Sequence, residues 1–303
     1  MTVRPEVLTV GETMALVAPT LAEPLESATG FHLDPGGAES NVASHLAALG
    51  TPTAWASAVG DDALGRRLLR QLAERGVDVS LVRSDAAAPT GLYLKDPGRG
   101  VLYYRAGSAA SRLSAEFVDS LPIGDVRLVH VSGITAALSG SCDALLDALL
   151  DRAAAEGVPV SFDVNHRPSL WPSTDAAARR LLALAARADL VFVGLDEAEG
   201  LWGTTTPDEV RDLLPDPRVL VVKDGAVGAT SYEHGDGAGG AQGVHVPALV
   251  VDAVELVGAG DAFAAGYLHA MLRGEPAAER LRSGHARAVL TIADTADFPR
   301  GTP

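Results

Sequence analysis

Residues 258–261, Gly-Ala-Gly-Asp, combine groups that could bind a phosphate with one that could remove a proton beside it. They follow the apolar run 250–254 and open an amphipathic helical pattern. Glycines at a helix start let backbone N–H groups turn toward an anion, and the helix dipole favours negative charge there. The carboxylate of Asp261 would repel a bound phosphate, but it could accept the proton of a hydroxyl that attacks one. Aspartate is ionised at neutral pH, and a helix N-terminus keeps it so.

Other functions fit only part of this segment. Asp261 alone could be a helix-capping residue. A dinucleotide-binding fingerprint needs a third glycine where this chain has Phe263, and the Gly-Lys-Ser/Thr sequence of a P-loop is absent. The segment therefore predicts a phosphate-binding helix start of another kind.

Composition excludes several classes of function. The chain has 303 residues, with 24 Lys and Arg against 39 Asp and Glu, a net charge of −15. Binding to phosphate backbones or anionic membranes needs a basic face, so we expect neither a nucleic-acid nor a membrane partner. No apolar run reaches the about 18 residues of a membrane span, and Gly11 and Glu12 break the N-terminus early, so no signal peptide is expected. The single cysteine, Cys142, lies at a predicted helix start and is expected to be structural, in a cytoplasmic protein.

Short apolar runs alternate with helical patterns along most of the chain. This alternation predicts an α/β fold with a mostly parallel central sheet and helices on both faces. The predicted strands are residues 7–10, 53–59, 128–132, 158–163, 190–193, 219–223 and 229–232. The predicted helices are residues 40–49, 64–75, 141–156, 174–187, 208–214, 261–273 and 277–293.

Residues 12–35 and 90–105 interrupt this pattern with alternating polar and apolar residues and turn sequences. We expect them to form antiparallel hairpin strands of a small β-sheet that stands off the main sheet as a lid. The Gly-rich stretch 233–243 is predicted to be a flexible hairpin tip. Without an internal repeat or a long linker, we expect a single domain, residues 1–303, that includes this lid.

Two separate signatures resemble those of the ribokinase (PfkB) family of sugar kinases. The first comprises residues 36–43, Gly-Gly-Ala-Glu-Ser-Asn-Val-Ala, and residues 59–62, Val-Gly-Asp-Asp. The second is the segment 258–261 with Phe263 and Gly266. They lie about 220 residues apart in the family's order, so the resemblance covers nearly the whole chain and implies a ribokinase-like fold.

Four further segments are similar to those of 2-keto-3-deoxygluconate kinases within this family: residues 89–93, 103–109, 130–135 and 163–171. This similarity implies ATP-dependent phosphorylation of the C6 hydroxyl of 2-keto-3-deoxygluconate or its galactonate epimer. Asp261 would then be the general base, and Gly258, Ala259 and Gly260 would form the anion hole.

The resemblance also implies ligands elsewhere. The implied substrate-binding residues are Gly36, Gly37, Asn41, Tyr93, Tyr103, Arg105, Arg167 and Asp297. The implied ATP-binding residues are Asn165, Lys223, Gly225 and Gly228, together with Gly258 and Gly260. Glu197 would place Mg²⁺ through water, although Gly194 stands where the family has Asn. In some relatives the neighbourhood of Glu255 binds a monovalent cation, and an exposed lid sheet often dimerises, so both a cation and a homo-oligomer are expectations.

Arg105 and Arg167 indicate an acidic substrate, because the planar fork of arginine pairs bidentately with a carboxylate. Arg167 follows a buried strand, at the end where open α/β sheets bind ligands. Tyr103 and Tyr104 alternate in direction, so only Tyr103 is expected to face the pocket. Two alternatives stay open. A kinase for a neutral sugar or nucleoside (fructose, ribose, adenosine) would leave two pocket cations without a partner, and a non-catalytic sugar- or nucleotide-binding module would leave Asp261 without a role.

Overall fold

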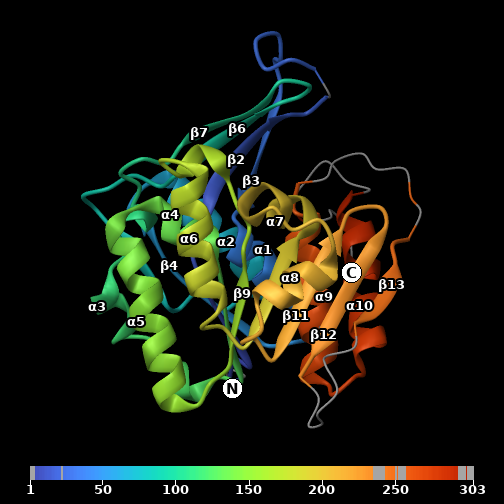
Figure 1. Ribbon diagram of the computed structural model, residues 1–303. Helices are drawn as coiled ribbons and strands as arrows, with labels where there is room; N and C mark the ends of the chain where they lie inside the picture. Colours follow the sequence, from blue (N-terminus) through green and yellow to red (C-terminus); the bar gives the residue numbers. More distant parts are fainter. Residues whose placement is uncertain are drawn as a thin grey trace.

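The computed structural model describes residues 4–21, 23–234, 243–249, 251, 257–292 and 298. Figure 1 shows a large central sheet between helices and a smaller sheet at one end of it. The large sheet has nine strands in the order β13-β12-β11-β10-β9-β8-β1-β4-β5. Its strands are β1 (Val7–Val10), β4 (Thr53–Gly60), β5 (Val82–Asp85), β8 (Leu128–Ser132), β9 (Val160–Asp163), β10 (Leu190–Gly194), β11 (Val219–Asp224), β12 (Gly228–Glu233) and β13 (Val244–Pro247).

Neighbouring strands from β5 to β11 pair in parallel, and β12 and β13 complete the other edge in antiparallel pairing. Strands β1, β8 and β10 are buried at every residue, as expected of short apolar strands covered on both faces. The mostly parallel sheet is therefore confirmed. The predicted hairpin tip falls between β12 and β13, and residues 235–242 lie outside the described residues.

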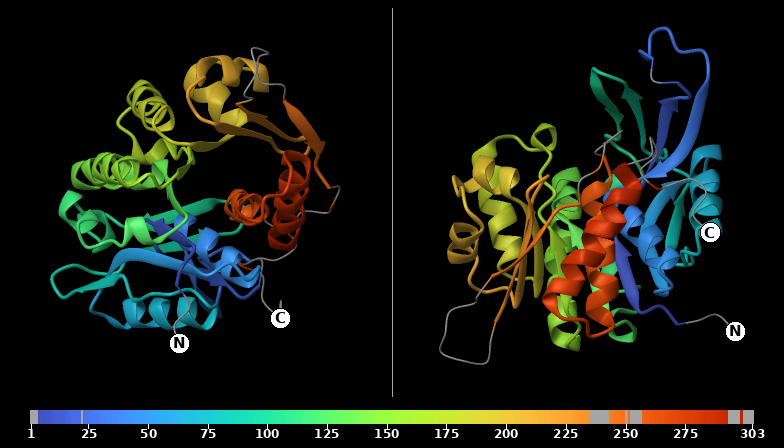
Figure 2. Two further views of the ribbon diagram at one scale, coloured as in Figure 1. Left: turned by 90° about the horizontal axis from the view of Figure 1, so that it is seen from below. Right: turned by 90° about the vertical axis from the view of Figure 1, so that its right-hand side faces the viewer.

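Helices cover both faces of this sheet. Two apolar clusters join one face to α1 (Ala38–Ala48), α2 (Ala63–Glu74), α9 (Ala259–Leu272) and α10 (Ala277–Ile292). The other face carries α3 (Ala115–Val118), α4 (Gly133–Leu138), α5 (Gly140–Glu156), α6 (Thr174–Ala185), α7 (Leu195–Trp202) and α8 (Pro207–Leu213). Three short 3-10 helices lie in the connections: η1 (Ala110–Arg112), η2 (Ile123–Asp125) and η3 (Pro168–Leu170). Figure 2 shows α9 and α10, in red, on the opposite side of the sheet from the green α5.

The predicted helices and strands are confirmed with small shifts at their ends, but several elements were missed. Helix α4 has six residues and α7 has eight, too few for a helical period to show. Helix α7 also follows β10 directly, so the apolar run of the strand hides the boundary. The edge strand β5 reads Val-Arg-Ser-Asp, which has no apolar run.

The smaller sheet has the order β3-β2-β6-β7. Its strands are β2 (Met14–Pro19), β3 (Phe31–Gly36), β6 (Leu92–Asp96) and β7 (Gly100–Tyr104). Strands β2 and β3 form one antiparallel pair and β6 and β7 another, and β2 joins β6 in parallel. The predicted separate small sheet is therefore confirmed. Leu102 and Tyr104 of β7 are 47% and 62% exposed, and association of two copies through this sheet stays a prediction.

The chain enters the small sheet where strands of the large sheet end. Residues 11–13 connect the carboxyl end of β1 to β2, and β3 leads back into α1 through Gly37. Figure 1 shows the small sheet standing beyond this end of the large one. Open α/β sheets bind ligands at the carboxyl ends of their strands, so this is where a site is expected. Among the described residues, no helix is both long and apolar enough to cross a bilayer.

Glu39, in the first turn of α1, is a buried carboxylate near the point where the chain passes between the two sheets. Its Oε1 accepts hydrogen bonds from Ser132 N at 3.1 Å, Ser132 Oγ at 2.7 Å and Thr135 Oγ1 at 2.9 Å. A Cβ on Gly11 would come within 2.1 Å of its Cδ, so the carboxyl group needs a glycine there. Burial raises the pKa of Glu39, although hydrogen bonds from Ser132 and Thr135 oppose the rise. Glu39 thus ties α1 to β8 and α4.

Glu39→Gln tests this assignment through the pH dependence of stability. Because the folded-state pKa lies above the ordinary 4.5, the carboxyl stabilises the fold fully below that value. That contribution is lost as the pH rises through the folded-state pKa, and glutamine does not titrate. We expect the free energy of unfolding of the variant, relative to wild type, to rise between about pH 5 and about pH 8. Urea denaturation at both pH values measures it, and a pH-independent difference would contradict the assignment.

Candidate active site

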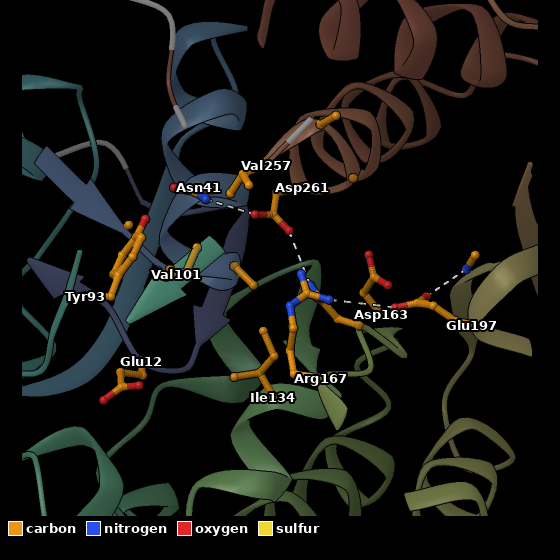
Figure 3. Close-up of a pocket in the computed structure, with 18 of the residues that line it drawn as sticks. Glu12, Asn41, Tyr93, Val101, Ile134, Asp163, Arg167, Glu197, Val257 and Asp261 are labelled. Carbon is orange, nitrogen blue, oxygen red and sulfur yellow. Dashed lines mark hydrogen bonds and ion pairs between the residues drawn. The ribbon is translucent and has the colours of Figure 1, made fainter. Parts of the chain in front are cut away.

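A cavity of about 560 Å³ lies between the small sheet, the start of α9 and the carboxyl ends of the central strands. Figure 3 shows Glu12 and Tyr93 on one side of Asp261, and Asp163 and Glu197 on the other. The lining includes the predicted residues Gly36, Gly37, Asn41, Tyr93, Tyr103, Arg105, Asn165, Arg167, Glu197, Lys223, Gly225, Gly258, Ala259, Gly260 and Asp261. It also includes Glu12, Met14, Ala38, Val101, Ile134, Asp163, Gly194, Asp196 and Val257, which were not predicted as ligand-binding residues.

The structure does not bring every predicted residue to the cavity. Gly228 begins β12 and is not among the lining residues. Its φ is +149°, and a Cβ there would come within 2.4 Å of the carbonyl oxygen of Val246, so β13 requires a glycine at this position. Asp297 and Glu255 lie outside the described residues. Cys142 is buried in the first turn of α5, where burial raises the pKa of its thiol, consistent with a structural residue.

The start of α9 supplies the phosphate-binding geometry. Gly258 precedes the helix with φ +85°, in the left-handed region that favours glycine. The N–H groups of a first helical turn have no partner within the helix. Since residues 258–260 line the cavity, their N–H groups and the helix dipole can hold an anion there.

Two amide side chains hold the carboxylate of Asp261. Asn41 Nδ2 donates to Oδ2 at 2.9 Å, and Asn165 Nδ2 donates to Oδ1 at 3.4 Å, as Figure 3 shows for the Asn41 contact. Asn165 has φ +41°, a conformation that is uncommon for a residue other than glycine. The resemblance assigned Asn165 to ATP, whereas the structure places its amide against Asp261. Asn41 Oδ1 is buried without a hydrogen-bond partner among the described residues, which leaves an acceptor for a ligand hydroxyl.

Lys223, at the end of β11, brings a positive charge to the start of α9. Its Nζ donates to both carboxylate oxygens of Asp163, at 3.2 and 3.0 Å. A Cβ on Gly260 would lie 3.5 Å from the same Nζ. Burial alone would lower the pKa of Lys223, but Asp163 and Glu197 raise it above the ordinary value, so the ammonium group stays charged. Asp163 ends a buried strand, which is the signal that could have identified it.

Glu197, in the first turn of α7, is held by backbone donors on both oxygens. Gly194 N donates to Oε2 and His166 N donates to Oε1, each at 2.8 Å. Burial raises the pKa of Glu197, Lys223 opposes the rise and Asp163 adds to it. A cation bound nearby would favour the ionised form of this carboxyl group.

The carboxylates that line the cavity fit a magnesium ion that is held through water and through the phosphates of a nucleotide. Among the residues that the structure describes, no group of three or more His, Cys, Asp or Glu side chains is placed to hold a metal. Mg²⁺ usually keeps several waters and binds through one or two carboxylates and substrate phosphates. The donor set therefore fits an ion held through water by Glu197 and through the phosphates of a nucleotide.

Arg105 and Arg167 reach the cavity from different elements. Arg167, after β9, is about half-exposed; its Nη1 donates to the carbonyl of His166 at 3.0 Å and lies 4.0 Å from Glu197 Oε1. Arg105, after β7, is only 11% exposed, and its Nε donates to Glu12 Oε2 at 2.6 Å. Figure 3 shows Arg167 between Ile134 and Asp261. Both guanidinium groups retain N–H donors for a ligand.

Two tyrosines stack on the small-sheet side of the cavity. The rings of Tyr93 and Tyr103 lie 5.8 Å apart between centroids. A Cβ on Gly36 would come within 2.0 Å of the Tyr93 hydroxyl, so the glycine makes room for that ring. Tyr103 lines the cavity, and Tyr104 does not. Tyr104 is largely exposed rather than packed within the chain.

Comparisons with known proteins identify the family of this chain. Residues 4–297 match the family described as pfkB family carbohydrate kinase. The 2-dehydro-3-deoxygluconokinase of Bacillus subtilis (strain 168) is 35% identical over 302 residues, covering 97% of this chain and 91% of that protein. The 2-dehydro-3-deoxygalactonokinase of Haloferax volcanii is 33% identical over 316 residues, covering 98% and 94%.

The crystal structure of 2-dehydro-3-deoxygluconokinase from Thermotoga maritima matches with a TM-score of 0.83 at 23% identity, covering 98% of this chain and 96% of that one. This likeness confirms the predicted ribokinase-like fold. The extent of the family match, and relatives above 30% identity over nearly the whole chain, carry the activity class as well. The chain belongs to the pfkB family of carbohydrate kinases, which are phosphotransferases that act on a sugar hydroxyl.

Proposed function

We propose that this kinase transfers the terminal phosphoryl group of ATP to the C6 hydroxyl of 2-keto-3-deoxygluconate or of its galactonate epimer. The observation that carries the proposal is that Arg105 and Arg167 line the same cavity as Asp261, in a chain of net charge −15. Glu12 and Glu197 leave N–H groups of these two arginines unused. A sugar acid brings a carboxylate that can accept from those N–H groups, whereas a neutral sugar has no such anionic acceptor. The two relatives are named 2-dehydro-3-deoxygluconokinase and 2-dehydro-3-deoxygalactonokinase, and both names describe this class of acceptor.

In this proposal, Asp261 accepts the proton of the attacking hydroxyl. Its carboxylate is 9% exposed, and the amides of Asn41 and Asn165 contact different oxygens, which orients it. Asn41 also offers its unpaired Oδ1 to a second hydroxyl of the sugar. A positioned general base of this kind contributes about 10²- to 10⁴-fold to a rate.

Phosphoryl transfer depends mainly on positioning and on neutralising charge. The backbone N–H groups of Gly258, Ala259 and Gly260 would bind the transferred phosphoryl group as an anion hole. Lys223 lies against Gly260 and would place its ammonium group on the phosphates of ATP, with Gly225 beside it. Glu197 would hold Mg²⁺ through water, and that ion would supply further neutralisation of the phosphate oxygens.

The acid end of the sugar would lie toward the small sheet. Arg105 and Tyr103 line the cavity on that side, and the guanidinium carbon of Arg105 lies 5.5 Å from the centre of the Tyr103 ring. Arg167 would approach the acceptor from the opposite wall, after β9. With the substrate bound between these walls, the small sheet would act as a lid over it and exclude water.

Asp261→Asn tests the base. The amide keeps the size of the side chain but cannot accept the hydroxyl proton, so we expect kcat to fall by about 10²- to 10⁴-fold. The Kd values for the sugar acid and for ATP should stay within a few-fold of wild type. ADP release gives the rate, and calorimetry gives both binding constants. Asp224→Asn, in β11 but outside the cavity lining, is the matched control. Near wild-type turnover by Asp261→Asn would refute the assignment.

Arg105→Ala and Arg167→Ala test the acidic substrate. Each charge-assisted hydrogen bond contributes about 1.5–3 kcal/mol, so each variant should raise KM for the sugar acid by about ten- to hundredfold. KM for ATP should change little. Arg99→Ala is the control, because Arg99 is exposed and pairs with Glu26 away from the cavity lining. If sugar-acid KM is unchanged in both cavity variants, the arginines do not bind the substrate carboxylate.

A further inference from the structure

Glu12 is a buried carboxylate on the cavity wall for which the proposed reaction has no use. It lies in the connection from β1 to β2, where the chain enters the small sheet, and it is 2% exposed. Burying a carboxylate is unfavourable unless it is paired and hydrogen-bonded. Its partners therefore indicate what it does.

Both oxygens of Glu12 are engaged by residues that follow β7. Arg105 Nε donates to Oε2 at 2.6 Å, and Arg105 Nη2 pairs with the same oxygen. Ser108 Oγ donates to Oε1 at 2.7 Å. A Cβ on Gly91 would lie only 3.0 Å from Oε1, so the carboxylate is confined on that side as well.

These contacts fix which part of Arg105 a ligand can reach. A guanidinium group is planar and carries five N–H donors in a rigid fork. Glu12 occupies the edge formed by Nε and Nη2. One N–H of Nη1 and the second N–H of Nη2 lie along the adjacent edge, which Glu12 does not use. A bidentate partner of Arg105 must therefore approach along that edge.

The pair also changes how a carboxylate would be recognised. Arg105 and Glu12 together carry no net charge, so attraction by charge alone is weak. Recognition then depends on meeting a guanidinium edge whose direction is already set. Preorganised donors of this kind reduce the ordering that binding would otherwise require.

We propose that Glu12 is a positioning residue for substrate recognition, which orients Arg105 so that its free edge receives the carboxylate of the acceptor sugar. This inference rests on the proposed sugar-acid substrate. Glu12 acts through Arg105 and does not itself touch the substrate. It makes the site selective for an acid group at one place and angle.

Glu12→Gln is the central test. Glutamine keeps the shape and one acceptor oxygen but replaces the ion pair with a weaker hydrogen bond from Arg105 to a neutral acceptor. We expect KM for 2-keto-3-deoxygluconate to rise about tenfold, with kcat and KM for ATP within about twofold of wild type. By charge alone, the loss of a carboxylate near the ligand would lower this KM. Loss of the orientation of Arg105 therefore predicts an increase in this KM, whereas loss of negative charge alone predicts a decrease.

Two further variants isolate the mechanism. Glu12→Asp keeps the charge but withdraws it from Arg105 by one methylene, and it should also raise the sugar-acid KM. It provides a second measurement if Glu12→Gln does not fold. Glu26→Gln is the matched control, because Glu26 also pairs with an arginine beside the small sheet, but at an exposed position. That control should leave every kinetic constant unchanged.

A double-mutant cycle decides whether Glu12 acts through Arg105. In the Arg105→Ala background, Glu12→Gln should have no further effect on KM for the sugar acid. An unchanged or lowered KM in Glu12→Gln alone, or a full additional increase in the double variant, would overturn the inference. If wild type does not phosphorylate sugar acids, the proposed function fails and the inference with it. If wild type does so and Arg105→Ala raises KM while Glu12→Gln does not, the inference alone fails.

Discussion

The hydrogen bond from Asn41 to Asp261 is the contact on which the rest of the site depends. It joins α1 to the start of α9 and so brings together two segments that lie 220 positions apart in the chain. Those helices pack on the same face of the sheet, in an apolar cluster that includes Val42 and Phe263. The packing of that face therefore determines where the carboxylate of Asp261 lies in the cavity.

Three carboxylates of the site lie beside its cations, and each of the three lies at the end of a different central strand. Glu12 follows β1 and holds Arg105, while Asp163 ends β9 and holds Lys223. Glu197 follows β10 and lies near Arg167. A strongly acidic chain can thus present cations to anionic ligands without leaving charges buried and unpaired. Because parallel strands end together at one edge, the fold places these pairs around one cavity.

The sequence was sufficient to predict the alternation of strands and helices, the small sheet and most of the residues that line the cavity. Those residues are recognisable because their types and spacing form motifs at strand ends and helix starts. The partners were not recognisable in the same way. Glu12 is a single acid before the first strand of the small sheet. Its partners Arg105 and Ser108 follow β7, and only the folded chain brings these two connections together. Gly228 is the opposite case. The resemblance assigned it to ATP binding, but the close approach of β13 explains why this position needs a glycine.

In the proposed function, the cavity binds the acceptor sugar by the sugar's carboxylate, and the enzyme phosphorylates the sugar's terminal hydroxyl. The most direct measurement is the rate of ADP release by the wild-type enzyme with Mg-ATP and a panel of acceptors. The panel comprises 2-keto-3-deoxygluconate, its galactonate epimer, fructose, ribose and adenosine. We expect turnover confined to the two keto-deoxy acids. Efficient turnover of a neutral sugar or nucleoside, without turnover of the acids, would contradict it.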